Sequence, residues 1–149
     1  MSVLGELQPN KVFKYFEEIC SIPHGSRNLQ QISDYLVDFA KAHELKYRQD
    51  EDLNVIIWKD GSKGYEASEP VILQGHMDMV AVKEADCDKD MEKEGLDLEI
   101  NGDYISAKGT SLGGDDGIAV AYTLAVLDDE DMAHPPIEAI FTVNEEIGM

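Results

Sequence analysis

The spacing of apolar positions predicts two amphipathic helices at the start of the chain, followed by short strands and one further helix. From Asn10 to Ile22 and from Asn28 to Glu44, apolar residues recur every three or four positions, as on one face of a helix. Later runs are shorter and rich in β-branched and aromatic residues, which is typical of strands. The expected strands lie at 45–50, 54–60, 71–76 and 137–146, with a hairpin turning at Asn101–Gly102 and a helix at 115–129.

Interspersed helices and short apolar strands indicate an α/β fold, a mixed sheet flanked by helices. The run at 71–76 ("VILQGH") is continuously apolar until its last residues, so we expect a central strand buried on both faces. The length of 149 residues is enough for one hydrophobic core. The charged segment from Lys83 to Gly95 has no clear period and is interpreted as a solvated excursion.

Charge and cysteine content narrow the choice of partners and compartment. The chain has 12 Lys plus Arg against 31 Asp plus Glu, a formal net charge of −19. Such a surface repels phosphate backbones, so we expect no nucleic-acid partner. No apolar run approaches the roughly 20 residues that cross a bilayer, and the start of the chain does not resemble a secretory signal, so no membrane partner is expected. Cys20 and Cys87 are interpreted as reduced thiols of a cytoplasmic protein.

A histidine and an aspartate close the apolar strand at 71–76. Side chains at His76 and Asp78 are two positions apart, so in an extended segment they project to the same side. A histidine that binds a metal usually has its second ring nitrogen held by a carboxylate or a carbonyl. The pair therefore fits a metal site, although in isolation a histidine hydrogen-bonded within the fold explains it better, because short motifs match by accident.

Two further acidic clusters lie at the ends of predicted elements. Asp115 and Asp116 follow two glycines at the entry to the helix, where carboxylates are also favoured by the helix dipole alone. Glu145 and Glu146 follow the last strand, where they could be two solvated glutamates or a metal ligand beside a general base. Each pair on its own has an ordinary structural explanation.

Taken together, the three clusters predict a divalent metal site. Ligands of open α/β sheets lie beyond the carboxyl ends of the strands, and His76, Asp78, Glu145 and Glu146 occupy such ends. If the two strands are parallel neighbours, the clusters meet at one edge. One imidazole with several carboxylates suits zinc or manganese better than a soft metal, and two ions sharing a carboxylate form a known hydrolytic arrangement.

Three stretches of the sequence resemble successive signatures of the dinuclear zinc aminopeptidase and carboxypeptidase clan. They are "VILQGHMDMV", "KGTSLGGDDGIAVA" and "HPPIEAIFTVNEEIGM". The opening "KVFKYFEEICSIPHGS" and the following helix and strands are similar to the aminoacyl-histidine dipeptidase branch (Xaa-His or β-alanyl-histidine dipeptidase) of that clan. The resemblance covers nearly the whole chain. It implies a zinc-peptidase-like fold and a hydrolase that cleaves dipeptides, with Xaa-His as the expected substrate class.

The resemblance also implies a role for each site residue. His76 would ligate one zinc, Asp115 would bridge both, and Glu146 would ligate the other. Asp78 would orient His76, and Glu145 would be the general base that deprotonates a metal-bound water and returns the proton to the leaving amine. Two zinc ions are the implied cofactor, with manganese or cobalt as alternatives.

The resemblance extends only to the N-terminal part of such an enzyme. In this family a further histidine and a further carboxylate ligand, together with a second domain for dimerisation and substrate closure, come from later sequence. We therefore expect residues 1–149 to be the N-terminal part of the catalytic domain, incomplete and inactive alone. An open sheet edge should favour homo-oligomers. His24, His43 and His134 are interpreted as surface residues.

Two alternatives to an Xaa-His dipeptidase stay open on the sequence, namely another enzyme of the same clan and a non-catalytic module. The metal motifs are shared across the clan, so a tripeptidase or an N-acyl amino acid deacylase would show them too. A non-catalytic module with the same fold is a third hypothesis, which the intact Asp115, Glu145 and Glu146 disfavour.

Overall fold

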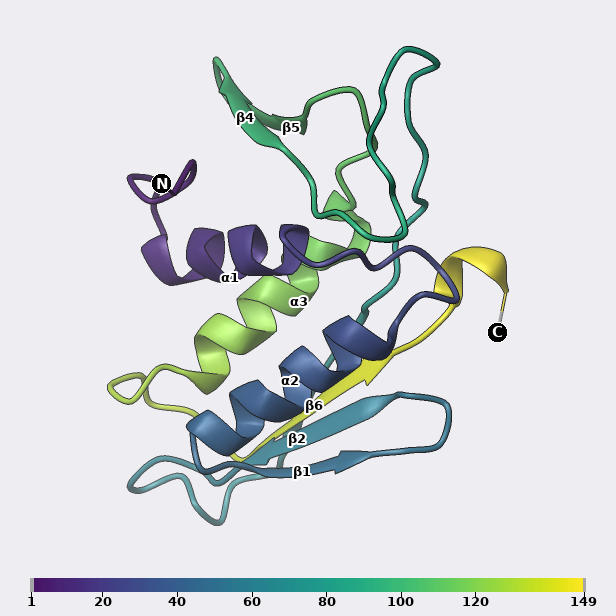
Figure 1. Ribbon diagram of the computed structural model, residues 1–149. Helices are drawn as coiled ribbons and strands as arrows, with labels where there is room; N and C mark the ends of the chain where they lie inside the picture. Colours follow the sequence, from purple (N-terminus) through teal and green to yellow (C-terminus); the bar gives the residue numbers. More distant parts are fainter. Residues whose placement is uncertain (1, 149) are drawn as a thin grey trace.

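The computed structural model describes residues 2–148 as a mixed α/β domain, which confirms the predicted fold class (Figure 1). Its elements are α1 (Asn10–Cys20), α2 (Gln30–Ala42), β1 (Lys46–Gln49), β2 (Val55–Lys59), β3 (Val71–His76), β4 (Leu98–Asn101), β5 (Tyr104–Ala107), α3 (Gly114–Leu127), β6 (Ile137–Thr142) and the short 3-10 helix η1 (Glu145–Ile147). Every helix and strand expected from the apolar pattern is present, with ends shifted by a few residues.

Four strands form the main sheet in the order β1-β2-β6-β3. The pairs β1–β2 and β2–β6 are antiparallel, whereas β3 and β6 are parallel. In the parallel pair His76 lies opposite Thr142, so both strands end at the same edge of the sheet. This register brings the residues after β3 and the residues after β6 together, which is the condition for a shared site.

The prediction that β3 is a central strand buried on both faces is wrong. Among the described residues β3 is an edge strand, and the side chain of Ile72 is 60% exposed. The central strand is β6, where Ile137, Ala139 and Phe141 are buried and alternate with more accessible residues. A short apolar run shows that a strand is hydrophobic but not how many neighbours it has, because edge and central strands share that composition.

The hydrophobic core lies between the sheet and the helices. Buried residues of β2 and β6 (Val55, Ile57, Ala139 and Phe141) lie in one layer with buried residues of the three helices. In Figure 1, α2 lies over β2 and β6, and α1 lies beside α3. Helix α3 approaches β3 closely at Gly75. Gly75 allows this approach, because a Cβ there would stand 3.1 Å from Oδ2 of Asp116 and 3.5 Å from Ala119.

Helix ends differ in detail from the sequence expectation. Helix α1 begins directly after Pro9, as proline's fixed φ permits. Helix α2 begins at Gln30, two residues later than the start expected at Asn28, and Leu29 is its N-cap. The Asn28 side chain instead donates to the carbonyl of Glu92, 2.9 Å away. The loop from Lys83 to Gly95 is therefore attached to the start of α2, although most of its side chains are exposed as predicted.

The predicted hairpin around Asn101–Gly102 is confirmed by β4 and β5, which stand apart from the main sheet (Figure 1). Gly102 has a φ of +63°, the left-handed conformation that tight hairpin turns require. Within residues 2–148, none of the helices combines the length and apolar character needed to cross a bilayer.

Candidate metal centre

The histidine at the end of β3 is buried and held from both ring nitrogens. Nδ1 of His76 lies 3.0 Å from the carbonyl oxygen of Asp78 and 3.3 Å from its Oδ1. Nε2 lies 3.0 Å from Oδ1 of Asp115 and 3.8 Å from Oε2 of Glu145. The ring therefore presents Nε2 to the acidic residues of two other elements, the orientation expected of a metal ligand.

Asp115 and Asp116 lie at the N-terminal end of α3 but do not have helical dihedral angles. Gly113 precedes them with a φ of +71°, and a Cβ on it would stand 2.9 Å from Sδ of Met79. The turn therefore needs glycine both for its conformation and for its close approach to Met79. The two aspartates therefore lie at the entry to the helix, before its first regular turn.

The two aspartates serve different parts of the fold. The side chain of Asp115 is 86% exposed and points to His76 Nε2. Oδ2 of Asp116 instead accepts a hydrogen bond from the backbone N–H of His76, at 3.2 Å. Asp116 thus holds the end of β3, and only Asp115 faces the open side of the cluster.

Glu145 and Glu146 begin η1, which two residues separate from the end of β6. Asn144 precedes them in the left-handed conformation, with a φ of 55°. The turn sends Glu145 towards His76 Nε2, and its side chain is half exposed. Glu146 instead joins His76 and Asp115, because one ligand atom from each of the three lies within 4.8 Å of the other two.

The donor set fits a divalent ion such as zinc. An ion about 2.0–2.2 Å from imidazole nitrogen and carboxylate oxygen holds its ligand atoms up to about 4 Å apart. The cluster of His76, Asp115 and Glu146 is already close to that spacing. One nitrogen and two carboxylate oxygens are also the ligand types that zinc and manganese accept.

Asp78 connects the two strand ends that form the cluster. Its side chain is buried and accepts hydrogen bonds from the backbone N–H groups of Glu145 (3.0 Å) and Glu146 (3.3 Å) and from Oγ of Ser26 (2.7 Å). Burial alone would raise the pKa of Asp78, but these donors and nearby His76 outweigh it and lower that pKa. Asp78 is therefore held as a carboxylate.

The electrostatic environment of His76 is strongly negative. Burial alone would lower its pKa, but the hydrogen bonds to Asp115 and to the Asp78 carbonyl, with the charges of Asp116 and Asp78, outweigh burial and raise the pKa. The metal-free ring is thus stabilised as a cation among carboxylates. A divalent ion would replace this proton as the positive charge of the site.

Two of the three remaining histidines are not surface residues, contrary to expectation. His24 is 3% exposed and His134 is 6% exposed, whereas the side chain of His43 is 30% exposed. Nδ1 of His24 lies 2.6 Å from the carbonyl oxygen of Ile22, and burial lowers its pKa. Both buried residues flank a proline, in "PH" and "HP", and neither belongs to a periodic apolar pattern that would have predicted its burial.

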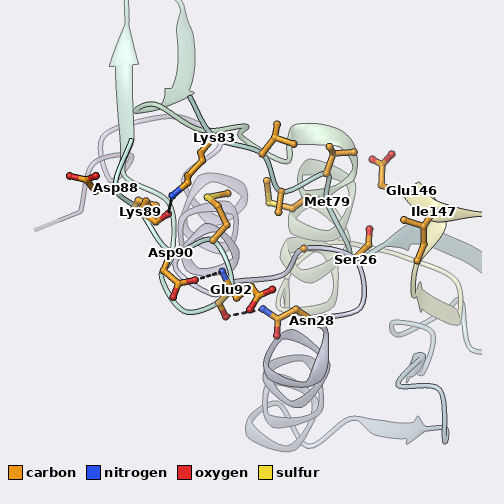
Figure 2. Close-up of a pocket in the computed structure, with 15 residues that line it drawn as sticks. Ser26, Asn28, Met79, Lys83, Asp88, Lys89, Asp90, Glu92, Glu146 and Ile147 are labelled. Atoms are coloured by element: carbon orange, nitrogen blue, oxygen red, sulfur yellow. Dashed lines mark hydrogen bonds between the residues drawn. The ribbon is translucent and has the colours of Figure 1, made fainter. Parts of the chain in front are cut away.

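An open pocket of about 820 Å³ adjoins the cluster (Figure 2). Ser26, Met79 and Glu146 lie along one side, and residues 88–92 of the charged loop form the opposite side. Because Glu146 belongs both to the cluster and to the pocket wall, a molecule in the pocket would lie beside the metal ligands.

The fold of this chain is similar to that of solved peptidase structures. A crystal structure of aminoacylhistidine dipeptidase from Vibrio alginolyticus superimposes with a TM-score of 0.95 at 39% identity, over 98% of this chain and 30% of that one. A tripeptidase structure from Staphylococcus aureus shares the fold, with a TM-score of 0.75 at 24% identity over 97% of this chain and 39% of that chain. No protein-family model matches the sequence.

The sequence comparison leads to the same group of enzymes. The chain is 41% identical over all 149 residues to the cytosol non-specific dipeptidase of Escherichia coli K12, of which it covers 31%. It thus resembles the N-terminal portion of such dipeptidases and spans about three tenths of the length of these two relatives.

Proposed function

We propose that the chain carries part of the metal centre of a metallopeptidase that hydrolyses dipeptides, Xaa-His dipeptides among them. The observation that carries this proposal is the convergence of His76, Asp115 and Glu146 from three separate elements onto one point. The similarity to proteins named as dipeptidases supports the reaction class. The name aminoacylhistidine dipeptidase supports the Xaa-His preference, and the name non-specific dipeptidase supports a wider one.

In this proposal each residue of the cluster has one task. His76 and Glu146 bind separate divalent ions, most simply zinc, and Asp115 binds both. Such ions lower the pKa of a coordinated water and polarise a peptide carbonyl. Asp78 fixes the ring of His76 through Nδ1, which leaves Nε2 free to bind.

Glu145 is the proposed general base. Its half-exposed carboxylate lies beside the cluster, 3.8 Å from His76 Nε2, and solvent reaches it. From that position it can accept a proton from a water molecule and return it to the leaving amine. In this proposal the two neighbouring glutamates have different roles: Glu145 transfers a proton and Glu146 binds an ion.

Two zinc ions need more ligands than the cluster provides. Zinc in catalytic sites has about three protein ligands and one open position, whereas His76, Asp115 and Glu146 provide three ligands in all. We propose that residues 1–149 act as the N-terminal part of a catalytic domain, whose further ligands and substrate-closing domain lie in the portion of the relatives that this chain does not match. The chain alone would then bind zinc but not turn over substrate, and it would form homo-oligomers.

Calorimetric titration of the metal-free chain with zinc tests the proposal. We expect saturable binding that is weakened at least tenfold by Glu146→Gln, since the change removes a charged ligand. Glu69→Gln is the matched control, because Glu69 is an exposed glutamate in the loop before β3. A chain that binds no zinc, or a Glu146→Gln variant that binds it as well as Glu69→Gln does, would remove the basis of the proposed function.

A further inference from the structure

The loop formed by residues 24–28 follows α1 and lies against the segment that leaves β3. The N–H of Met79 donates to the carbonyl of His24 at 3.1 Å, and the N–H of Ser26 donates to the carbonyl of Met79 at 3.2 Å. Gly25 pairs with Met79 between these two bonds, and a Cβ on Gly25 would stand 2.7 Å from Cβ of Ala81. The backbone at Ser26 is therefore fixed close to the cluster of His76, Asp115 and Glu146.

Ser26 uses this position to bind one oxygen of Asp78. Its hydroxyl donates to Oδ2 at 2.7 Å, and the same oxygen accepts the N–H of Glu146 at 3.3 Å. The other oxygen, Oδ1, accepts the N–H of Glu145 at 3.0 Å and faces Nδ1 of His76 at 3.3 Å. The Ser26 bond has the usual length of a hydroxyl–carboxylate hydrogen bond, so it restrains rotation of the carboxylate.

A second contact links the same loop to the same turn. The N–H of Arg27 donates to Oδ1 of Asn144 at 2.8 Å, and Asn144 directly precedes Glu145. The loop thus holds η1 both through a side chain of the turn and through Asp78. Ser26 is half-buried and lines the pocket beside Glu146 (Figure 2), so it connects the pocket wall with the support of the cluster.

We propose that Ser26 is a positioning residue that acts through Asp78 on the ring of His76 and on the backbone of Glu145 and Glu146. The contact network itself is independent of any metal, but the consequence for zinc binding rests on the proposed function. Two readouts are therefore needed, one in the metal-free chain and one with zinc.

The first readout is hydrogen exchange of the Glu145 and Glu146 amides in the metal-free chain, followed by NMR. Removing the hydroxyl in Ser26→Ala should speed exchange of both amides about fivefold, because the acceptor that holds them gains freedom. Ser26→Thr, which keeps a hydroxyl, should stay near wild type. Cysteine is close to serine in size but is a weak hydrogen-bond donor, so Ser26→Cys should behave like Ser26→Ala. If Ser26→Ala does not fold, the exchange rates of Ser26→Cys test the inference in its place.

Ser111→Ala is the matched control for loss of a serine hydrogen bond nearby. Its hydroxyl donates to the carbonyl of Val80 at 2.6 Å, on the same segment after β3 but without touching Asp78. We expect exchange of the two glutamate amides to be unchanged in this variant. Equal acceleration in Ser111→Ala, unchanged exchange in both Ser26→Ala and Ser26→Cys, or failure of Ser26→Thr to restore protection would each overturn the inference.

The second readout is zinc affinity by calorimetry. It should fall about tenfold in Ser26→Ala and Ser26→Cys and be restored in Ser26→Thr, as for residues that orient metal ligands. If the wild-type chain binds no zinc, the proposed function fails while the exchange result still decides the role of Ser26. If the wild type binds zinc and Ser26→Ala binds it equally well, the positioning role is refuted instead.

Discussion

Asp78 is the residue whose removal should affect the fold and the cluster together. The substitution Asp78→Ala takes away the acceptor of three hydrogen bonds, from Ser26 and from the backbone N–H groups of Glu145 and Glu146. The side chain is only 1% exposed, so the change also leaves a small polar cavity in the protein interior. Asp116 does not compensate, because its carboxylate already accepts the N–H of His76.

The size of the effect follows from the number of hydrogen-bond donors that are left without an acceptor. A buried donor without a partner costs about 1–3 kcal/mol, and water can reach η1 and Ser26, so we take about 1 kcal/mol for each of the three donors. The expected loss is about 3 kcal/mol of unfolding free energy, which lowers the melting temperature of a chain of this size by about 6–12 °C.

Urea denaturation and scanning calorimetry of the metal-free chain measure this loss. Asp60→Ala is the control, because Asp60 is an exposed aspartate at the end of β2 and the change alters net charge equally. We expect the control to stay within about 0.5 kcal/mol of wild type. If Asp78→Ala also stays within that range, the hydrogen bonds to Asp78 do not hold the ends of β3 and β6 together, and the account of the site given above is wrong.

Three further predictions concern acid stability, association and a glycine. Hydrogen bonds from Ser2, Val3 and Leu4 outweigh burial and lower the pKa of Glu17 below its usual 4.5. The Glu17 carboxylate therefore stabilises the fold above pH 4.5, and this stabilisation is lost as the pH falls through the pKa of Glu17 in the folded chain. The melting temperatures of Glu17→Gln and wild type should converge only in acid. Ile72→Lys, on the free edge of β3, should shift the chain towards monomer in sedimentation velocity, and a monomeric wild type would contradict this. Gly113→Ala should lower the melting temperature more than Gly102→Ala does, because both have positive φ but only Gly113 has a close neighbour, Met79; equal losses would show that the contact does not matter.

Local patterns were sufficient to predict the elements and the sheet edge where polar residues gather. Alternation in Ile137, Ala139 and Phe141 is a property of neighbouring residues, so it can be recognised without knowing the partner strands. The edge position of β3 could not be predicted in this way. It depends on which strands lie beside it, and the sequence of residues 71–76 carries no record of that.

Apart from Asp78, which was expected to orient His76, the supports of the cluster were missed by sequence reasoning. Ser26 and Asp78 are 52 positions apart, and Arg27 and Asn144 are 117 apart. A lone serine or asparagine in a loop has no period and no motif, so nothing in the sequence distinguished these residues from ordinary loop residues. Asp116 had a weak signal, since it follows a metal-ligand candidate, but its bond to the N–H of His76 depends on how α3 packs against β3.

The arrangement of charges explains why these supports are needed. Ligand oxygens of Asp115 and Glu146 approach within 4.8 Å, and two negative charges at that distance repel by about 1 kcal/mol in water and by several times more near a protein surface. The same carboxylates raise the pKa of His76, so protonation of that ring would offset part of this repulsion. The carboxylates would move apart unless the backbone held them, and the hydrogen bonds of Asp78 to η1 and of Asp116 to β3 supply that restraint. The restraint that keeps the cluster together thus comes from Asp78 and Asp116, which lie outside the cluster of His76, Asp115 and Glu146.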